Sequence, residues 1–288
     1  VCYDPVLYRE VQSFVPRNGD IIEASFPRSG SHWLQQILQL ILRKGESAGS
    51  YLEFTRRSPY LENRVPEGME SPRLLRTHFS MDRIQLNSRA KYLYVARNPW
   101  DCCVSCFHFV REIPACQFQD GSFEDFLDAF LERQSSFGDY FDHVISGYKR
   151  RKEPNVFFIT YEELQKDIEC SVLRLARFLG EDHEQTLKDH HNILQSILEK
   201  SSTVFMKNLM RTNPKEMRKA LLELPGAPPP SDELTEENGN GSTVVNILRQ
   251  GTVGDWRKYF SEDGMNKMRA KIEEKTRESD FMTLWGDV

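Results

Sequence analysis

The chain lacks the hydrophobic run of a transmembrane helix and has no excess of basic residues. Its apolar segments are far shorter than the roughly 20 residues that cross a bilayer, and its first residues show neither a basic stretch nor an apolar one. Lysine and arginine number 38 against 43 aspartates and glutamates, a formal net charge of −5. General nucleic-acid binders depend on neutralising phosphates. We therefore expect no membrane, no signal peptide and no nucleic acid, and any anionic ligand must be bound by a local cluster of basic side chains.

Cysteine is scarce, with six residues in 288, and three of them lie close together at Cys102, Cys103 and Cys106. This segment contains one C-x-x-C spacing, but no second pair and no H-x-x-x-H follows to complete a four-ligand zinc site. We therefore expect no metal. The thiols should pack as small apolar side chains on one face of a helix, in a reducing, cytoplasmic compartment.

The nucleoside triphosphate motif G-x-x-x-x-G-K-[ST] is also absent, which argues against a nucleotide kinase. What the chain does have is 39% hydrophobic and 11% aromatic residues, enough for a sizeable core. Its length suits one large α/β domain or two small ones. Because it shows no internal repeat and no linker, we expect a single domain over residues 1–288.

The apolar pattern predicts an α/β fold with a central parallel sheet flanked by helices. Four short apolar runs bounded by turn residues are typical of buried strands: 20–26, 73–77, 91–97 and 155–161. Helical periodicity fills segments between and after them: 33–41, 123–130 and 172–179. Gly180 is expected to end the last of these as a left-handed C′ residue.

Residues 224–242 interrupt this pattern with four of the 14 prolines and three glycines. Such a segment is a loop. A lid over a binding site and an inert surface insertion are both compatible with it.

The segment SFPRSGSHW, residues 25–33, lies between the first strand and the first clear helix. A helix N-terminus offers unpaired N–H groups and the positive end of the dipole to an anion. Gly30 allows close backbone approach, Ser31 and His32 add donors, and Arg28 adds a bidentate fork. The alternative is an ordinary turn with a serine N-cap.

Two other segments place basic residues beside helix starts or glycines. Arg97 ends a strand, Pro99 suits the first turn of the next helix, and Ser105 follows about two turns after Arg97, so that both could face one anion. Arg249 lies beside Gly251. For either arginine, the alternative is a surface salt bridge.

Together these segments resemble the cytosolic sulfotransferase family. SFPRSGSHW resembles its 5′-phosphosulfate loop, YVARNPWDCCVSCFHF its 3′-phosphate strand–loop–helix, and RQGTVGDW its C-terminal phosphate loop. Arg76-Thr77-His78 takes the place of Lys-Thr-His, and Tyr161-Glu162-Glu163-Leu164 resembles the tyrosine segment beside adenine. The resemblance covers nearly the whole chain. It implies a nucleotide-kinase-like fold and transfer of a sulfuryl group from 3′-phosphoadenosine 5′-phosphosulfate (PAPS) to a small acceptor.

The same resemblance assigns a donor site by position. Its residues would be Arg28, Ser29, Gly30, Ser31, His32, Trp33, Arg97, Ser105, Tyr161, Ser201, Thr203, Arg249, Gln250 and Gly251. The loop from Ser29 to His32 would cradle the 5′-phosphate, while Trp33 and Tyr161 would contact adenine. The 3′-phosphate would fall to Arg97, Ser105, Arg249 and Gly251.

His78 would be the general base, since a histidine with a pKa near ~6.5 can take a hydroxyl proton at neutral pH. It follows the strand 73–77, at the edge where α/β sites form. Arg28 and Arg76 stand where the family most often has lysine and would stabilise the leaving phosphate without a metal. The alternative for His78 is a purely structural role.

Three positions depart from the family pattern and favour weaker donor binding. His32 replaces a hydroxyl residue, Thr203 replaces an aromatic one, and Gln250 replaces a lysine. A lost charge-assisted bond costs roughly 1.5–3 kcal/mol, about one to two decades in affinity. A non-catalytic 3′-phosphoadenosine nucleotide-binding protein is therefore the alternative function.

On the acceptor side the expected residues are Phe26, Tyr60, His78, Phe109 and Glu112. Tyr60 and Phe109 match aromatic residues that line the family's acceptor pocket, although plain core packing is the alternative. Glu112 lies one turn beyond His108 and would pair with an ammonium, which favours a phenolic monoamine. A solvated surface acid is the alternative reading of Glu112.

The family's dimer motif, K-x-x-x-T-V-x-x-x-E, falls on Arg257, Ser261, Glu262 and Asn266. Its valine has become an acid and its acid an amide. We therefore expect a monomer or a weak homodimer.

Overall fold

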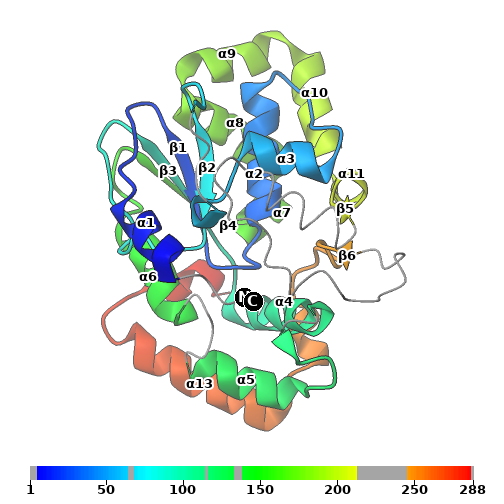
Figure 1. Ribbon diagram of the computed structural model, residues 1–288. Helices are drawn as coiled ribbons and strands as arrows, with labels where there is room; N and C mark the ends of the chain where they lie inside the picture. The colour runs from blue at the N-terminus through cyan, green and yellow to red at the C-terminus, as the bar shows by residue number, and fades with distance from the viewer. Residues whose placement is uncertain (1–4, 64–67, 114–115, 133–137, 213–244, 287–288) are drawn as a thin grey trace, which may run out of the picture.

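The central sheet has four parallel strands in the order β2-β1-β3-β4. The computed structural model (Figure 1) describes residues 5–63, 68–113, 116–132, 138–212 and 245–286. The strands are β1 (Ile21–Ala24), β2 (Leu74–Thr77), β3 (Lys91–Ala96) and β4 (Val156–Thr160). All four lie within the segments predicted from the sequence, so the α/β fold with a parallel sheet is confirmed. The loop predicted at residues 224–242 lies outside the described residues.

The register of the strands brings their carboxyl ends to one edge. Ala24 of β1 pairs with Thr77 of β2 and with Tyr94 of β3, and Ala96 pairs with Thr160 of β4. The residues that directly follow the strands therefore emerge side by side. Such an edge is where open α/β sheets bind their ligands.

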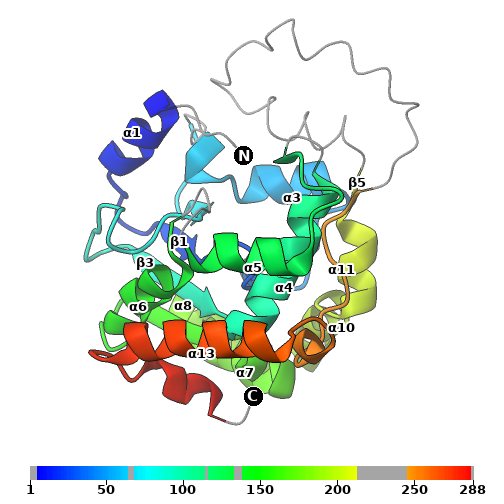
Figure 2. The same cartoon turned by 90° about the horizontal axis from the view of Figure 1, so that it is seen from below.

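Helices cover both faces of the sheet (Figures 1 and 2). They are α1 (Pro5–Ser13), α2 (Ser31–Leu42), α3 (Tyr51–Arg57), α4 (Pro99–Glu112), α5 (Phe123–Leu131), α6 (Tyr140–Lys149), α7 (Tyr161–Lys166), α8 (Ile168–Leu179), α9 (Glu181–Asp189), α10 (His191–Lys200), α11 (Thr203–Leu209) and α13 (Glu262–Thr276). Short 3₁₀ helices are η1 (Leu61–Asn63), η4 (Asp255–Lys258) and η5 (Phe281–Trp285), and β5 (Arg211–Thr212) pairs antiparallel with β6 (Val245–Asn246).

Alternation along β3 explains the two apolar cores. Tyr92 and Tyr94 pack in the core beneath α4, α5, α6 and α13, whereas Leu93 and Val95 pack in the core beneath α2 and α8. Successive side chains of a strand point to opposite faces. Both faces of β3 are therefore buried, as its near-continuous apolar sequence requires.

Local sequence signals set several helix starts. Asn98 caps α4 by accepting from the backbone N–H of Asp101, and Pro99 occupies its first turn. Thr160 caps α7 through a capping box with Glu163. Thr160 is also the last residue of β4, and Asn98 comes two residues after β3, so the chain turns from sheet to helix at the carboxyl edge.

Gly180 does end α8, but not as expected. Its φ of 164° and ψ of 148° are extended backbone, and it is at the same time the N-cap of α9. The left-handed C′ conformation predicted for Gly180 is therefore wrong. Because a second helix starts at the next residue, the chain needs a corner between two helices rather than a left-handed cap.

The cysteines of α4 are buried, as expected, with Cys102 and Cys103 fully inaccessible and Cys106 nearly so. Burial raises the pKa of the Cys102 and Cys103 thiols. Among the described residues, no group of three or more His, Cys, Asp or Glu side chains is arranged to bind a metal. None of the helices in the described ranges is long and apolar enough to span a bilayer.

Candidate active site

A cavity of about 540 Å³ opens at the carboxyl edge of the sheet, between the start of α2, the α4 helix and residues 247–251. Most residues that the resemblance selects lie on its wall. These are Arg28, Gly30, Ser31, His32, Trp33, Tyr60, His78, Arg97, Ser105, Phe109, Tyr161, Ser201, Thr203, Arg249, Gln250 and Gly251. Segments separated by more than 200 residues in the sequence therefore meet around one volume.

Four of the selected residues do not line the cavity. Ser29 is buried against Cys102, with 3.8 Å between Oγ and Sγ. Phe26 packs edge-to-face on Phe130 and Tyr140 inside the core. Glu112 is exposed at the end of α4. Arg76 is fully buried behind the wall.

The loop that leads into α2 has an unusual backbone. Gly30 has a φ of 112°, and a Cβ on it would lie 2.8 Å from Cδ2 of Tyr161. Gly30 is itself the N-cap and makes no side-chain cap hydrogen bond, so the serine-capped turn considered above is not what the structure contains. Arg28 also adopts the left-handed region, with a φ of 69°. Strain of this kind often occurs where a loop binds a ligand.

Arg97 connects three segments of the site. Its Nη1 donates to the carbonyl of Arg28 at 3.4 Å, and its Nη2 donates to the carbonyl of Thr252 at 3.1 Å. Its guanidinium lies 4.6 Å from the ring centre of Tyr161. Its Nε is buried and has no partner among the described residues. A buried donor without an acceptor is costly, so this atom is available for an anion.

Arg28 reaches α4 rather than solvent. Its Nε donates to Oγ of Ser105 at 3.2 Å, and its guanidinium lies 4.7 Å from the ring centre of Phe109. Burial lowers the pKa of Arg28, and the positive charge of Arg97 lowers it further, whereas the Glu112 carboxylate acts in the opposite direction.

The loop at residues 249–256 is held in place by contacts along its length. Arg249 forms a 2.6 Å ion pair with Asp255. Asp101 of α4 accepts hydrogen bonds from the backbone N–H groups of Gly254 at 2.7 Å and Trp256 at 3.1 Å. The Tyr161 hydroxyl donates to the carbonyl of Gly251 at 2.8 Å. The loop is therefore held where Arg249 and Gly251 reach the cavity.

The tautomer of His78 follows from its partner. Its Nδ1 lies 2.9 Å from the carbonyl oxygen of Ser25, which can only accept, so Nδ1 carries the proton and the lone pair is on Nε2. Burial lowers the pKa of His78 to about 3, and the positive charge of Arg76 contributes to the shift. The ordinary pKa near 6.5 assumed from the sequence is therefore wrong for the ligand-free protein.

Sequence reasoning missed the residues that hold His78 in place. Buried Glu62 accepts from the backbone N–H of His78 at 2.5 Å and from Oγ1 of Thr77 at 2.9 Å. Nε2 of buried His143 lies 3.0 Å from the carbonyl oxygen of His78, and the Tyr94 hydroxyl lies 2.6 Å from Nδ1 of His143. Burial raises the pKa of Glu62 to about 7. No spacing in the sequence connects these residues, because each contact crosses between elements.

Arg76 is the most unusual side chain of the site. It is completely buried, and none of its three side-chain nitrogens has a hydrogen-bond partner among the described residues. Its guanidinium lies over aromatic rings instead, 4.0 Å from the ring centre of Tyr60 and 5.2 Å from that of Phe54. Glu23 stands opposite it in the register of β1 and β2, and burial raises the pKa of Glu23 to about 7.

Residues 18–280 match the family described as "Sulfotransferase domain". The chain is 28% identical over 285 residues to sulfotransferase 1 family member D1 of Rattus norvegicus, which covers 94% of this chain and 88% of the relative. It is 31% identical over 270 residues to 3-alpha-hydroxysteroid sulfotransferase of Cavia porcellus, which covers 91% of this chain and 85% of the relative.

Two solved structures share the fold of this chain. The crystal structure of mouse sulfotransferase SULT7A1 complexed with PAP superposes with a TM-score of 0.68 at 25% identity, covering 96% of this chain and 91% of that one. Retinol dehydratase in complex with androsterone and inactive cofactor PAP superposes with a TM-score of 0.71, covering 94% and 84% of the two chains. At 22% identity, this second likeness shows the fold alone.

Proposed function

The chain belongs to the PAPS-dependent sulfotransferase family, and from that premise we propose that it transfers a sulfuryl group to the hydroxyl of a small aromatic acceptor bound beside His78. One observation supports this assignment above the others. Arg28, Arg97 and Arg249 converge on a single cavity in a protein of net charge −5. A cavity with this concentration of positive charge suits a ligand with several negative charges.

The residues present fit the donor. Arg97 and Arg249 with Ser105 would hold the 3′-phosphate, because the buried Nε of Arg97 has no partner among the residues that the structure describes. The start of α2, whose N-cap is a glycine without a side-chain cap, would hold the 5′-phosphate.

Aromatic side chains on the same wall would take the adenine. Trp33 and Tyr161 form a pair with ring centres 5.3 Å apart, and Nε1 of Trp33 donates to the carbonyl of Ser201 at 2.8 Å. This bond fixes the indole plane. A flat purine gains dispersion energy from such a fixed aromatic surface.

His78 would act as the base. When bound, the donor supplies the sulfuryl group and carries negative charge into the site. Nε2 of His78 holds the lone pair that receives the acceptor's hydroxyl proton, while Ser25 and Glu62 keep the imidazole in position. Negative charge nearby favours the imidazolium, so donor binding should raise the pKa of His78 from its ligand-free value of about 3. Arg28 and Arg76 supply fixed positive charge for the leaving phosphate.

Transfer of labelled sulfuryl from PAPS to a panel of phenols, alcohols and amines tests the proposal. We expect wild-type turnover on small phenols and a loss of at least 10²-fold in His78→Ala, with binding of adenosine 3′,5′-bisphosphate unchanged by calorimetry. Turnover retained in His78→Ala would remove this residue from the mechanism. Binding of the bisphosphate without transfer to any acceptor would favour the non-catalytic nucleotide-binding alternative.

We propose that the aromatic acceptor is a phenolic monoamine, that is, a phenol that also carries an ammonium group. Glu112 is exposed at the end of α4 and does not line the cavity. Its carboxylate would therefore pair with the ammonium of an acceptor that extends beyond the cavity. The test compares a simple phenol with its aminoethyl analogue in wild type and Glu112→Ala. An unchanged ratio of kcat/KM for the two acceptors would reject a role for Glu112.

We also propose a cytoplasmic location. Cys102, Cys103, Cys106, Cys116 and Cys170 are free thiols, which suits a reducing compartment. Fractionation of the native source with a specific antibody would test this, and recovery of the protein from a secretory compartment would contradict it.

A further inference from the structure

We propose that Trp285 is a positioning residue for the donor: its indole N–H acts through three polar side chains on the loop at residues 249–256. This inference rests on the proposed function and adds a residue that supports the 3′-phosphate site from outside the cavity. Trp285 lies in η5 and does not line the cavity. It is buried in the core and packs edge-to-face on Phe281, with 6.3 Å between the ring centres.

The indole of Trp285 is bonded to the segment that follows β4. Its Nε1 donates to Oε2 of Glu162, in the first turn of α7, at 2.7 Å. The other carboxylate oxygen, Oε1, accepts from two N–H groups of Asn98, the backbone N–H at 3.1 Å and Nδ2 at 2.7 Å. Donors from two directions thus fix the orientation of the Glu162 carboxylate between η5 and the start of α4.

The amide of Asn98 bridges two carboxylates. Its Nδ2 has two hydrogens and donates to Oε1 of Glu162 and to Oδ2 of Asp101, the latter at 2.8 Å. Its Oδ1 accepts from the backbone N–H of Asp101 at 2.9 Å, which is the cap of α4. Asn98 and Asp101 are both buried. Because each polar atom of the amide is in use, a displaced Glu162 disturbs the bond that orients Asp101.

Asp101 continues the network into the loop at residues 249–256. Its two carboxylate oxygens accept from the backbone N–H groups of Gly254 and Trp256, as described above. In the same loop, the carbonyl of Thr252 accepts from Arg97, the residue directly before Asn98. Asn98 therefore lies where the bonds from Trp285 meet both the arginine and the loop that would bind the 3′-phosphate.

The network holds its two carboxylates without a cation in contact. Neither Glu162 nor Asp101 forms an ion pair with a residue that the structure describes, so N–H groups alone hold them. Hydrogen bonds to an ionised acceptor are about twice as strong as neutral ones. Without the indole N–H, Oε2 of Glu162 loses its donor, and this half-buried carboxylate gains by turning towards water. Such a rotation withdraws Oε1 from Asn98.

The effect of Trp285 on ligands is expected to be selective. The network ends at the loop and the arginine that would bind the 3′-phosphate. A nucleotide with that phosphate should therefore detect the loss of the indole N–H. Adenosine 5′-monophosphate, which lacks the 3′-phosphate, should not. A residue that only stabilised the fold would affect both nucleotides alike.

The experiment measures binding of adenosine 3′,5′-bisphosphate and adenosine 5′-monophosphate by calorimetry in wild type, Trp285→Phe and Glu162→Gln. The first variant keeps an aromatic ring in the core and removes the N–H. The second tests the same link without touching the core, because its amide opposes the indole N–H with a donor. We expect each variant to weaken bisphosphate binding about tenfold, the order of one lost hydrogen bond to a charged group, and monophosphate binding less than about twofold.

The double variant checks that both substitutions break one link. Its loss of bisphosphate affinity should be no greater than that of the more affected single variant, since residues in one network are not additive. Phe281→Leu is the matched control. Phe281 is fully buried in the same 3₁₀ helix and contacts Trp285, but takes no part in the polar network. It should lower the thermal midpoint at least as far as Trp285→Phe and leave the ratio of the two affinities unchanged.

Two outcomes would overturn the inference alone. One is an equal loss for both nucleotides, or no loss for either, in Trp285→Phe and Glu162→Gln. The other is a pair of losses that add in the double variant, which would mean that the two residues act separately. A wild-type protein that binds neither nucleotide would instead overturn the proposed function, and this inference with it.

Discussion

Gln250 is the side chain whose chemistry departs furthest from what a phosphate site requires. It lines the cavity between Arg249 and Gly251, in a loop that Asp101 and Tyr161 hold in place. A lysine there would add a positive charge without disturbing the anchors. We expect Gln250→Lys to tighten binding of adenosine 3′,5′-bisphosphate by roughly one to two decades, the value of a charge-assisted hydrogen bond of roughly 1.5–3 kcal/mol.

Calorimetry at fixed ionic strength measures this change. The control is Gln250→Met, which adds no charge and should leave the affinity within about threefold of wild type. Equal affinities for wild type and Gln250→Lys would show that the position does not face the 3′-phosphate.

The depressed pKa of His78 makes a testable contribution to stability. Its folded pKa of about 3 lies below the value near 6.5 in an unfolded chain, so between these values only the unfolded chain binds the proton. Stability therefore falls as the pH drops below about 6.5. From pH 7 to pH 5, the unfolding free energy of wild type should fall by about 2 kcal/mol more than that of His78→Gln.

Urea unfolding at the two pH values, without ligand, measures the difference. Saturating adenosine 3′,5′-bisphosphate should reduce it, because bound negative charge favours the imidazolium. A difference that does not depend on pH would mean that His78 keeps an ordinary pKa in the folded protein.

At the scale of single residues, the sequence predicts which residues line the cavity better than it predicts what surrounds each of them. Arg97 and Ser105 reach one cavity because they belong to the same local strand–loop–helix segment. The neighbours of Arg76 could not be predicted from the residues beside it in the sequence. Tyr60, Phe54 and Glu23 all approach it from outside its own strand. For the same reason the low pKa of His78 could not be predicted, because burial by tertiary packing is its main cause.

At the scale of elements, the turn from β1 into α2 depends on Gly30. Its φ of 112° is strained for any other residue, and a Cβ would lie 2.8 Å from the Tyr161 ring. We expect Gly30→Ala to cost about 3 kcal/mol, of which the positive φ explains about 1 kcal/mol and the contact the rest. Binding of adenosine 3′,5′-bisphosphate should weaken as Tyr161 is displaced.

Gly138→Ala provides the matched control. Gly138 has a φ of 84°, but nothing lies within 4 Å of its Cβ position, so only the backbone cost of about 1 kcal/mol applies. Thermal and urea unfolding compare the two variants. Equal losses would mean that the Tyr161 ring moves aside freely.

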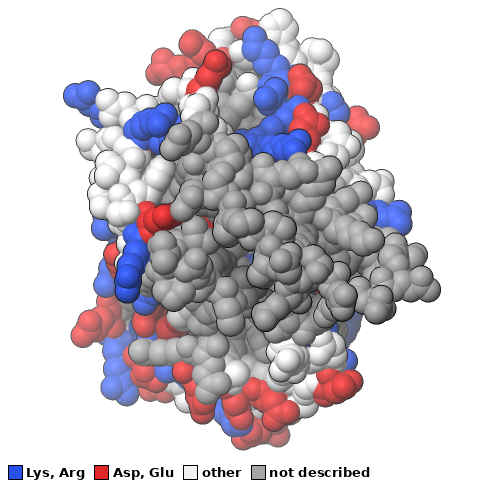
Figure 3. All heavy atoms as spheres, in the orientation of Figure 1, with Lys and Arg blue, Asp and Glu red and all other residues white. Residues whose placement is uncertain are grey.

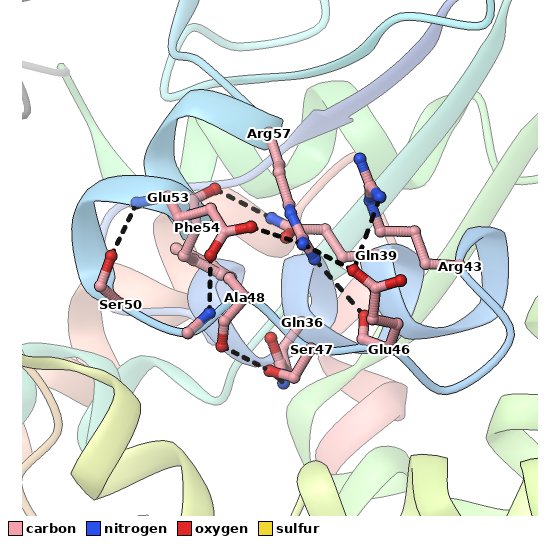
Figure 4. Close-up of polar contacts among 11 residues, drawn as sticks. Gln36, Gln39, Arg43, Glu46, Ser47, Ala48, Ser50, Glu53, Phe54 and Arg57 are labelled. Atoms are coloured by element: carbon pink, nitrogen blue, oxygen red, sulfur yellow. Dashed lines mark hydrogen bonds and ion pairs between the residues drawn. The ribbon is translucent and has the colours of Figure 1, made fainter.

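The elements themselves were largely predictable because both faces of the sheet are buried. Continuous apolar runs marked β1 to β4, and stripes at helical spacing marked α2, α5 and α8. The sequence failed at Gly180, where the corner between α8 and α9 depends on how the two helices pack. It also could not reveal that α3 packs against His32, because that contact depends on the Gln39 bond between α2 and α3 (Figure 4).

At the scale of the whole molecule, a cluster of arginines lines the cavity of a protein whose net charge is −5. On the face seen in Figure 3, basic and acidic side chains are interspersed among the described residues. The arginines on the cavity wall are instead buried or half-buried, as Arg97 and Arg28 are. Selectivity for an anionic donor therefore depends on entering the cavity and not on a charged exterior.

The residues at the start of α13 affect whether the protein can form a dimer. Arg257, Glu262 and Asn266 are all exposed at this helix or just before it. A symmetric interface there would bring two copies of Glu262 into the same patch, and their like charges would repel. We expect a monomer of 33.6 kDa in size-exclusion chromatography with light scattering.

The double variant Glu262→Val with Asn266→Glu restores the family pattern at these two positions. It should raise the dimer fraction at equal concentration. A stable wild-type dimer that the double variant leaves unchanged would contradict the role given to this segment.

The wide sequence separation of the cavity's walls has a consequence for synthesis. Arg28 leaves the ribosome more than 200 residues before Arg249 and Gly251. A nascent chain thus contains the sheet but only part of the nucleotide pocket, so the donor cannot assist its early folding. Ligand stabilisation applies only after residues 249–251 have folded into place, so cellular donor supply should affect the lifetime of the folded protein rather than the yield of its early folding.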